Sequence, residues 1–340
     1  MSASIRDVAN DAGVSLGTVS NVLNRPDRVA PATAARVFAS IERLGFVRND
    51  AARMLRAGRS KTIGMIVHDV RNPFFTDVAR GAEERAAQAG LSILLGNSDD
   101  EIEREAGYVG LFEEQRVLGV LIAPLREELE ALHQLTSRGT PVVLVDRSDP
   151  QGRFPSVSVD DVAGGYMATR HLIDCGRKRI AFVGGPRSIR QVSDRLEGAW
   201  RAASESPGVT IEVIETSALT VLEGRSAGEL VALREPGDRP DGIFAANDLL
   251  ATGVLQAALM SDRLRVPDDI ALIGYDDIDF ASSAIVPLTS VRQPSALIGR
   301  TAIDLLLRDG ESAGSESEQV VFQPELVVRA STRAQDGDRA

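Results

Sequence analysis

Cysteine and histidine are nearly absent from the sequence, and their scarcity limits the chemistry that the chain can support. Cys175 is the single cysteine among 340 residues, so an intramolecular disulfide and a cysteine-rich zinc site are both excluded. The surrounding letters, HLIDCG, predict a small apolar role for Cys175 near the end of a helix. The three histidines, His68, His133 and His171, do not fall at the spacing of a metal-ligand pair. We therefore expect no metal and no cofactor.

Common catalytic motifs and long apolar segments are also absent. The sequence contains no GxSxG, no HExxH and no P-loop. Asp276 and Asp277 could suggest a catalytic carboxylate pair, but adjacent strand residues point to opposite faces. No apolar run approaches the roughly 20 residues that a membrane-spanning helix needs, and the chain begins with an amphipathic pattern instead of the apolar core of a secretion signal. These features predict a cytoplasmic protein that is not an enzyme.

Basic residues are in the minority overall, but they are concentrated near the N-terminus. The chain has 38 basic and 49 acidic residues, which gives a net charge of −11. Residues 1–60 contain nine Arg and five acidic residues, a balance of +4, and the remainder carries −15. Such a basic segment can neutralise DNA phosphates while the acidic remainder is repelled by them, although a merely solvent-exposed surface could carry the same charge.

The segment from Ser4 to Asn24 has the pattern of two short helices joined by a glycine turn. Apolar residues at i, i+3, i+4 and i+7 between Ile5 and Ala12 predict a first helix with Ser4 as its N-cap. Gly13 breaks the pattern, and Ser15 can cap a second helix. The buried face of that second helix is predicted to consist of Val19, Val22 and Leu23. This arrangement is typical of a helix-turn-helix, whose second helix enters the DNA major groove.

The outward side of the second helix and the residues that follow it supply the predicted DNA contacts. These are Ser15, Leu16, Gly17, Thr18, Ser20, Asn21, Asn24 and Arg28. Any pair of helices with a glycine turn could show this pattern, so the motif alone does not establish DNA binding. A third helix is predicted from Pro31 to Leu44, ended by Gly45, and three helices can share a small core. We therefore predict a DNA-binding head over residues 1–46.

Residues 47–60 are predicted to form a hinge helix and linker. The residues from Asn49 to Arg56 favour a helix, but two turns are too short to persist alone in water. Such a helix would be ordered only when it packs against something, and neighbouring arginines suggest DNA. Asn49, Ala52, Arg53 and Leu55 are the predicted contacts, with Leu55 as an apolar wedge in the minor groove. A plain interdomain linker is the alternative.

From Thr62 onward, short apolar runs alternate with amphipathic helices. The alternation begins with IGMIV at 63–67 and starts again with RIAFVG at 179–184. Continuous apolar strands separated by helices indicate parallel sheets covered on both faces. The predicted fold class is therefore α/β, with a three-helix helix-turn-helix head and hinge helix followed by two doubly wound parallel-sheet lobes.

The predicted core, residues 61–330, is divided between the lobes by connections that cross more than once. The first lobe is expected to contain residues of about 61–159 and 290–320, and the second lobe those of about 160–289 and 321–330. The tail, residues 331–340, is polar and is expected to be disordered.

Polar side chains at the carboxyl ends of the strands mark a predicted ligand cleft between the lobes. Doubly wound sheets bind ligands at this edge. The predicted effector-binding residues are Phe74, Asp146, Arg195, Asn247 and Asp276, and His68 follows the first strand. Carboxylates, a guanidinium and an amide suit the vicinal hydroxyls of a sugar. Each polar residue could instead be a helix cap, and Asp248 and Asp277 are interpreted as structural.

Several of these segments together resemble the LacI/GalR family of bacterial transcription regulators over nearly the whole chain. The matching pieces are DVANDAGVSLGTVSNVLN, NDAARMLRAG, NPFF, the VDR at 145–147, RLEG, AANDLLATG, VPDDIALIGYDD and PLTSVRQP. The resemblance implies a homodimer on a pseudo-palindromic operator, a core similar to type I periplasmic binding proteins, and a small effector, usually a sugar or sugar phosphate. It also implies that Arg195, Asn247 and Asp276 contact the effector and that Leu55 intercalates.

The sequence departs from the family pattern in three places. Leu16 and Gly17 occupy positions that commonly read bases, so Asn21, with Thr18 and Ser20, must contribute more. Leu219 stands near the place where some sugar-binding members have a stacking tryptophan, which argues against a pyranose stacked there. The C-terminus lacks the leucine heptads of tetrameric members, so we expect a dimer.

The combined hypothesis is a repressor whose operator affinity is switched by a ligand bound between the lobes. A sugar-binding protein without DNA-binding function is one alternative, and it predicts an export signal and no basic head. An enzyme that uses the cleft is the other, and the missing motifs argue against it.

Overall fold

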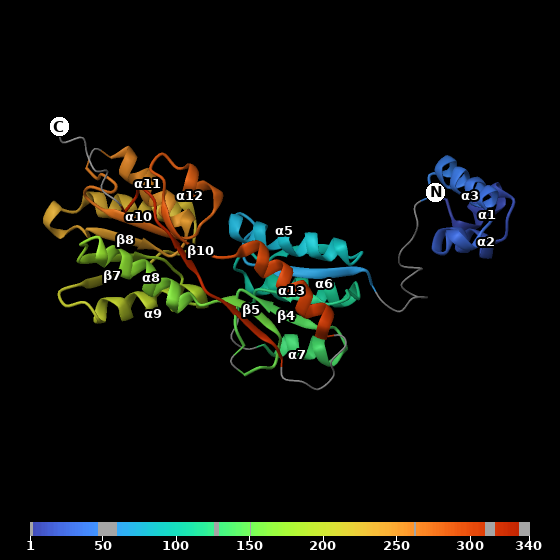
Figure 1. Cartoon of the computed structure of the whole chain (residues 1–340), viewed down its shortest axis with the longest axis horizontal. Coiled ribbons are helices and arrows are strands. Elements are labelled where there is room, and N and C mark those ends of the chain that lie inside the picture. Colours follow the sequence, from blue (N-terminus) through green and yellow to red (C-terminus); the bar gives the residue numbers. More distant parts are fainter. Residues whose placement is uncertain are drawn as a thin grey trace. The chain divides into compact units, whose positions relative to one another are not determined.

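The computed structural model describes residues 3–46, 60–125, 129–149, 151–261, 263–309 and 317–332. The chain divides into two units, one ending at Arg59 and the other beginning at Ser60 (Figure 1). The predicted hinge contacts Asn49, Ala52, Arg53 and Leu55 lie outside the described residues. No helix in the described part of the chain is long and apolar enough to cross a membrane.

The N-terminal unit contains three α-helices and a short 3-10 helix. They are α1 (Ile5–Ala12), α2 (Leu16–Asn24), η1 (Pro26–Arg28) and α3 (Pro31–Leu44). Ser4 caps α1 in a capping box, because its Oγ accepts from the Asp7 amide at 3.3 Å and its own amide donates to the Asp7 carboxylate at 2.8 Å. Gly13 ends α1 with φ at +64°, a backbone region that favours glycine.

The core of this unit forms where the three helices meet. Val8, Val19 and Val37 are fully buried, and Leu23 lies partly buried at its edge. Ser40 on α3 is buried as well, and its hydroxyl donates to the Asp11 carboxylate at 2.6 Å. These contacts tie α1 to α3 and leave one side of α2 facing outward.

The larger unit contains two six-stranded sheets (Figure 1). The first has the order β11-β5-β4-β3-β1-β2 and consists of β1 (Thr62–Val67), β2 (Ser92–Asn97), β3 (Val120–Ile122), β4 (Val142–Val145), β5 (Ser156–Val159) and β11 (Gln319–Phe322). The second has the order β12-β10-β9-β8-β6-β7 and consists of β6 (Arg179–Val183), β7 (Thr210–Ile214), β8 (Gly242–Ala245), β9 (Ala271–Asp276), β10 (Thr289–Arg292) and β12 (Glu325–Val327). All pairs are parallel except β10 with β12.

Helices cover both sheets and complete two lobes. The first lobe contains α5 (Pro73–Gln88), α6 (Ile102–Glu114), α7 (Glu130–Ser137) and α13 (Ser295–Asp309). The second contains α8 (Asp161–Asp174), α9 (Arg190–Ser204), α10 (Val221–Leu233), η2 (Pro236–Asp238), α11 (Asp248–Met260) and α12 (Asp279–Ser283). The predicted α/β fold class, with two parallel-sheet lobes, is confirmed.

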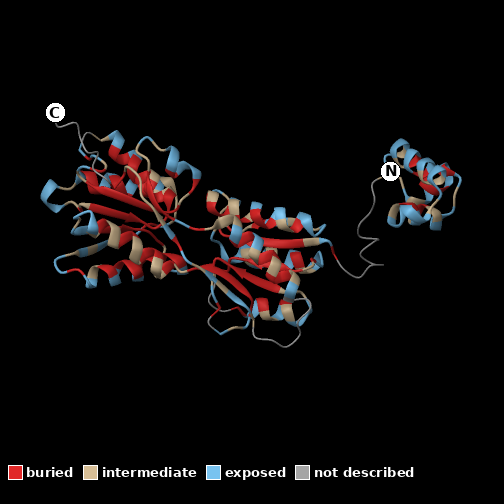
Figure 2. Cartoon of the chain, viewed as in Figure 1, coloured by how far each residue is buried: buried red, intermediate tan, exposed pale blue. Residues whose placement is uncertain are grey.

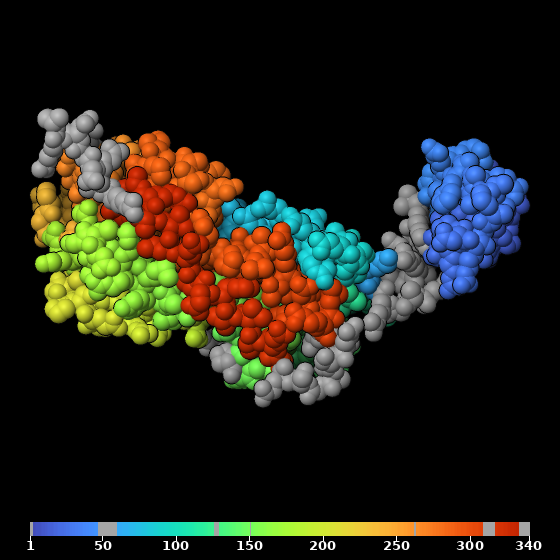
Figure 3. Space-filling view, in the orientation of Figure 1, coloured from blue at the N-terminus to red at the C-terminus, as the bar shows by residue number. Residues whose placement is uncertain are grey.

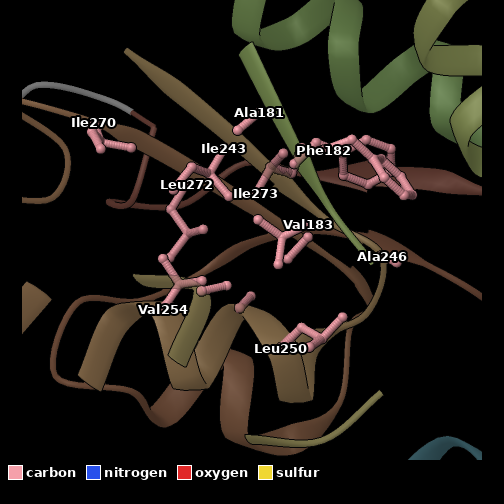
Figure 4. Packing of buried hydrophobic residues seen from close by; sticks show 14 of the residues in the cluster. Ala181, Phe182, Val183, Ile243, Ala246, Leu250, Val254, Ile270, Leu272 and Ile273 are labelled. Carbon is pink, nitrogen blue, oxygen red and sulfur yellow. The ribbon is translucent and has the colours of Figure 1, made fainter. Parts of the chain in front are cut away.

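The central strands β3, β4, β8 and β9 are buried along their whole length, as expected for a sheet covered on both faces (Figure 2). In the second lobe, side chains of β6, β8 and β9 meet Leu250 and Val254 of α11 in the apolar core (Figure 4). Because both sheets are fixed by such cores, the loops at their carboxyl ends are held in defined positions.

The two predicted boundaries between the lobes in the C-terminal part of the chain need correction. The strand β10 ends at Arg292 and pairs with β9, so residues 290–292 belong to the second lobe and not to the first. The chain then returns to the first lobe through α13 and β11, which ends at Phe322, and it crosses back into β12. The C-terminal part of the chain, coloured orange to red, therefore lies on both lobes (Figure 3).

The predicted disordered tail begins too early. Ser331 and Thr332 are buried, and the Ser331 hydroxyl donates to the Leu272 carbonyl at 2.6 Å. The Ser331 oxygen also accepts from the Thr289 amide at 2.8 Å. A polar composition misled the prediction because these side chains satisfy backbone groups of β9 and β10.

Candidate functional site

A cleft opens between the two lobes at the carboxyl ends of their strands, and each lobe supplies half of its lining. We call it the interlobe cleft. The predicted effector residues Phe74, Asp146, Arg195, Asn247 and Asp276 all line it. The sequence thus identified side chains that the fold brings together, while their contact with an effector stays a prediction.

The first-lobe wall is formed by the loop after β1 and the start of α5. Asn72 caps α5 by accepting from the Phe74 amide at 3.0 Å. Phe74 and Phe75 pack edge to face at 5.0 Å between ring centroids, and His68 stacks on Phe75 at 5.5 Å. The His68 Nδ1 atom lies 3.0 Å from the Asp100 carboxylate. This wall therefore combines two aromatic rings and an imidazole of fixed orientation with polar side chains such as Asn72 and Asp100.

Arg195 is the buried cation of the second-lobe wall. Its Nε donates to the Asp161 carboxylate at 2.8 Å, and its Nη1 donates to the Ala246 carbonyl at 2.7 Å. The guanidinium carbon lies 3.7 Å from the centroid of the Tyr275 ring. These contacts fix the side chain, so Arg195 presents a preorganised charge to the cleft.

Close packing of two helices places the Arg195–Asp161 pair. A Cβ atom on Gly165 of α8 would lie 2.0 Å from the Arg195 carbonyl, and one on Gly198 of α9 would lie 2.0 Å from the Val162 carbonyl. Only glycine permits this approach. The beginnings of α8 and α9 therefore meet, and their side chains can pair below the cleft.

Asp276 lies at the end of β9, where it contacts groups from both lobes. Its Oδ1 accepts from Gln293 Nε2 at 2.7 Å, and its Oδ2 accepts from Asn72 Nδ2, in the first lobe, at 3.2 Å. Burial raises the pKa of Asp276 to about 6, although Arg195, 3.8 Å away, counteracts part of this effect. The backbone φ of +101° is unusual for a non-glycine residue.

Asp146 occupies the corresponding place at the end of the first lobe's β4. Its backbone φ is +58°. Gln191, at the start of α9 in the second lobe, donates from Nε2 to the Asp146 carbonyl at 2.6 Å and to Oδ2 at 2.8 Å. Burial raises the pKa of Asp146 well above its usual range, and the nearby Asp161 carboxylate adds to the shift. Strained aspartates at both strand ends are typical of a functional site.

Asn247 combines a structural and a lining position. Its Oδ1 caps α11 by accepting from the Leu250 amide at 2.9 Å, and its Nδ2 donates to the Leu219 carbonyl at 3.3 Å. Asp248, by contrast, faces away from the cleft and accepts from Ser290 at 2.7 Å. Asp277 pairs with Arg329 at 2.6 Å, so both of these aspartates are structural, as predicted.

Asn72 and Gln191 line the cleft but were not among the predicted contacts, and neither were Asp161 and Gln293, which bond to Arg195 and Asp276 beside it. Asn72 and Gln293 belong to the NPFF and PLTSVRQP segments, so the signal was present in the sequence. Asp161 and Gln191 lie in the first turns of helices, where similar residues serve as caps. The place of Gln191 in the cleft and of Asp161 beside it follows from the helix packing, which no local pattern shows.

The head offers a second candidate surface on α2. Leu16, Gly17 and Asn21 are exposed on its outward side, and Arg28 is exposed on η1, which follows α2. Ser15 caps α2, because its Oγ accepts from the Thr18 amide at 3.1 Å, and the same oxygen lies 2.9 Å from Thr18 Oγ1. Asn24 donates to the Ser20 carbonyl at 2.8 Å and to the Ser20 hydroxyl at 3.3 Å, so these polar groups partly satisfy one another.

Within the ranges that the structure describes, no group of three or more His, Cys, Asp or Glu side chains could hold a metal ion. Cys175 is exposed at the end of α8, and its sulfur lies 3.7 Å from His171.

Comparison with protein families assigns both units. Residues 4–49 match the model described as "Bacterial regulatory proteins, lacI family", and residues 169–332 match "Periplasmic binding protein-like domain". The ribose operon repressor of Bacillus subtilis is 34% identical over 334 residues, which cover 98% of this chain and 100% of that protein. The chain belongs to the LacI family.

Two further relatives support this assignment. The repressor PurR of Photobacterium profundum is 33% identical over 335 residues, covering 97% of this chain and 99% of that protein. The crystal structure of the lac repressor dimer bound to operator and the anti-inducer ONPF has a TM-score of 0.83 and 27% identity, covering 98% of this chain and all of that chain. This LacI-family chain is a DNA-binding transcriptional regulator and not an enzyme.

Proposed function

We propose that this LacI-family protein is a repressor that binds a pseudo-palindromic operator as a homodimer and is switched by a sugar or sugar derivative. The observation that carries the proposal is the interlobe cleft, in which Asn72 bonds to Asp276 and Gln191 to Asp146 across the two lobes. A ligand that exchanges hydrogen bonds with these groups changes the relative stability of the lobe arrangements.

The chemistry of the cleft favours a hydroxylated ring. Carboxylates and amides accept and donate to hydroxyl groups, whereas the Phe74 and Phe75 rings offer an apolar surface to the C–H face of a sugar. The name of the ribose operon repressor of B. subtilis points to the same class of ligand. We assign Phe74, Asp146, Arg195, Asn247 and Asp276 as effector contacts on this basis.

Exposed apolar side chains support a homodimer. In the first lobe, Leu94 and Leu95 are exposed on β2, an edge strand, and Leu111 is exposed on the neighbouring α6. In the second lobe, exposed apolar residues occur on α10 and α11, which pack together: Leu222, Leu230, Leu233, Leu259 and Met260. Apolar surfaces of this kind mark association sites, and the lac repressor structure is a dimer.

The head reads the operator through α2 in this proposal. Asn21 can pair with a base edge, while Ser15, Leu16, Gly17, Thr18, Ser20 and Asn24 complete the surface and Arg28 contacts phosphate. Asn49, Ala52, Arg53 and Leu55 would extend the contact into the minor groove. Because DNA is the partner, we place the protein in the cytoplasm.

A direct test is to replace the proposed base-reading side chain. We expect Asn21→Ala to weaken binding to the selected operator by about tenfold or more, because a bidentate amide–base contact contributes roughly 1–3 kcal/mol. Operator fragments are first selected from genomic DNA, and binding is then measured by fluorescence anisotropy. Asn10→Ala, on the exposed side of α1, is the matched control.

The switch has its own readout. Coupling between two binding sites is reciprocal, so an effector that changes operator affinity must have its own affinity changed by the same factor in the presence of operator. Calorimetric titration of the effector with and without operator measures the change in effector affinity, and titration of the operator with and without effector measures the change in operator affinity. Identical effector affinities in the two titrations would refute a switch, and equal affinity for operator and random duplex would refute regulation altogether.

A further inference from the structure

Two buried polar atoms of the interlobe cleft have no hydrogen-bond partner within the described part of the protein. They are His68 Nε2 and Asp146 Oδ1, on residues that are only 6% and 4% exposed. Buried polar atoms in native proteins nearly always have a partner. Both residues line the cleft, so both atoms are available to a bound ligand.

Both atoms are hydrogen-bond acceptors, so both require a donor. The Asp100 carboxylate lies 3.0 Å from His68 Nδ1, and a carboxylate accepts, so Nδ1 carries the proton. In the neutral ring this leaves Nε2 as an acceptor. Asp146 Oδ2 already accepts from Gln191, which leaves Oδ1 as the second acceptor. The ligand groups that face them must donate.

The buried charges of the cleft are unbalanced toward the negative. Asp146, Asp161 and Asp276 surround one guanidinium, Arg195, which is committed to Asp161 and to the Ala246 carbonyl. Arg71, at the rim, pairs with Asp69 at 2.9 Å and Asp99 at 2.6 Å. Burial, more than the neighbouring carboxylates, raises the pKa values of Asp146 and Asp276 in the unliganded cleft, and hydrogen bonds donated by a ligand favour their charged forms. An anionic ligand placed beside these carboxylates is repelled.

Helix N-termini, the usual backbone sites for phosphate, do not relieve this repulsion. The first turn of α5 begins with Pro73, which has no N–H, and the Phe74 amide donates to Asn72. In α11 the Asn247 side chain occupies the Leu250 amide. The first turn of α9 has no side-chain cap, but through Gln191 it lies against the Asp146 carboxylate.

We infer that the interlobe cleft selects an uncharged ligand whose neighbouring groups donate hydrogen bonds to Asp146 Oδ1 and His68 Nε2, and that it rejects phosphorylated and carboxylated ligands. The inference rests on the proposed function and narrows its effector class to neutral polyhydroxylated rings. His68, fixed by Asp100, then acts as a specificity-determining contact.

The test compares neutral sugars with their anionic forms on the full-length protein. The probes are the common aldopentoses and aldohexoses, their 5- or 6-phosphates and the corresponding uronic acids, which keep the ring, titrated by calorimetry. We expect at least one neutral sugar to bind and its phosphate and uronic acid to bind about 100-fold more weakly, because like charges meet in a desolvated site. An anionic form that binds as tightly as its neutral parent, or a panel in which no neutral sugar binds, overturns the inference.

Measuring operator affinity in the presence of each ligand distinguishes a failure of this inference from a failure of the proposed function. A neutral sugar that binds selectively but leaves operator affinity unchanged refutes the switch and supports the selectivity. A phosphate ester that binds more tightly than the neutral sugar and releases the operator supports the switch and refutes the selectivity.

Two variants test the named acceptors. Asp146→Asn and His68→Gln should each weaken binding of the neutral sugar by about 10- to 100-fold. Asp146→Asn should also reduce the difference in affinity between the neutral sugar and its phosphate. The controls are Asp277→Asn, whose carboxylate faces Arg329 and Arg292, and His133→Gln, whose ring packs on Phe154. Unchanged sugar affinity in both test variants, with normal thermal unfolding, would contradict the assignment.

Discussion

Asp276 is the residue at which the strand end, the buried guanidinium and the other lobe meet. Its carboxylate accepts from Asn72 and Gln293 and lies 3.8 Å from Arg195. These partners favour the charged form, yet burial outweighs them and raises the pKa of Asp276 from 3.8 to about 6. Folding therefore takes up a proton at this residue over part of the pH range, and stability depends on pH.

We expect the free energy of unfolding of the unliganded protein to fall as the pH rises from about 4 to about 6. The raised pKa means that the stabilisation is complete below the unfolded-state value and is lost as the pH passes the folded-state value. A shift of this size corresponds to about 3 kcal/mol. Urea unfolding at a series of pH values measures it.

The variant Asp276→Asn isolates this contribution, because it removes the titration and retains an acceptor oxygen. The pH dependence between 4 and 6 should become shallower in this variant, while Asp277→Asn, which changes a salt-bridged carboxylate outside the cleft, should keep it. Equal slopes for Asp276→Asn and the unmodified protein would contradict the assignment.

Single residues of the site differ in how far the sequence predicts them. Asp146, Asn247 and Asp276 follow apolar runs, and the carboxyl ends of parallel strands share one edge of a sheet, so a cleft position follows from the pattern. Gln191 and Asp161 begin helices, and a residue there looks the same whether it caps its own helix or bonds to a distant element, as Gln191 does to Asp146 and Asp161 to Arg195. Only the tertiary arrangement separates the two cases.

At the scale of elements, the packing of helix α8 against helix α9 positions the charged side chains of the cleft. Gly165 and Gly198 lie where each helix meets the backbone of the other, and Asp161 and Arg195 pair next to this contact. The helices were predictable from their periodicity. Their close approach was not, because a glycine inside a helical pattern has no unique structural meaning.

Gly198→Ala should therefore disturb both stability and ligand binding. The added Cβ atom would lie 2.0 Å from the Val162 carbonyl, so the helices must separate. We expect a destabilisation of about 1–3 kcal/mol, as for overpacked cores, together with weaker effector binding as Arg195 moves. Thermal unfolding and calorimetric titration measure the two effects.

Gly110→Ala in α6 is the matched control for this change. Gly110 is exposed within a helix, and a Cβ atom there meets nothing within 4 Å. Alanine should stabilise this helix by roughly 0.5–1 kcal/mol, because glycine is the poorer helix former. If both substitutions shifted the melting temperature in the same direction, close packing of α8 and α9 would not be the cause.

Element ends show the same contrast between local and tertiary information. Ser4 and Ser15 cap α1 and α2 as predicted, because an N-cap is a local interaction that a short sequence specifies. The burial of Ser331 depends instead on backbone groups of β9 and β10, far away in sequence. Its polar side chain consequently resembled a disordered tail.

Across the whole effector-binding unit, the lobes are connected covalently by three crossings and noncovalently through the cleft. The order of the apolar runs predicted the two lobes, but the exact crossing after β10 required knowledge of strand pairing. Asn72 to Asp276 and Gln191 to Asp146 are the side-chain hydrogen bonds that span the cleft. Such contacts bias the equilibrium between closed and open lobes in the absence of ligand.

Asn72→Asp should shift this equilibrium toward open lobes. Aspartate retains the oxygen that accepts from the Phe74 amide, so α5 keeps its cap, but it replaces the donor to Asp276 by a second carboxylate. We expect a larger radius of gyration in small-angle X-ray scattering of the full-length protein, and effector binding weakened by about tenfold as the competent state is depopulated. Asn97→Asp is the matched control, since Asn97 accepts from the Val70 amide and lies outside the cross-lobe contacts. If both variants scattered like the unmodified protein and bound effector equally well, the Asn72–Asp276 bond would have no part in holding the lobes together.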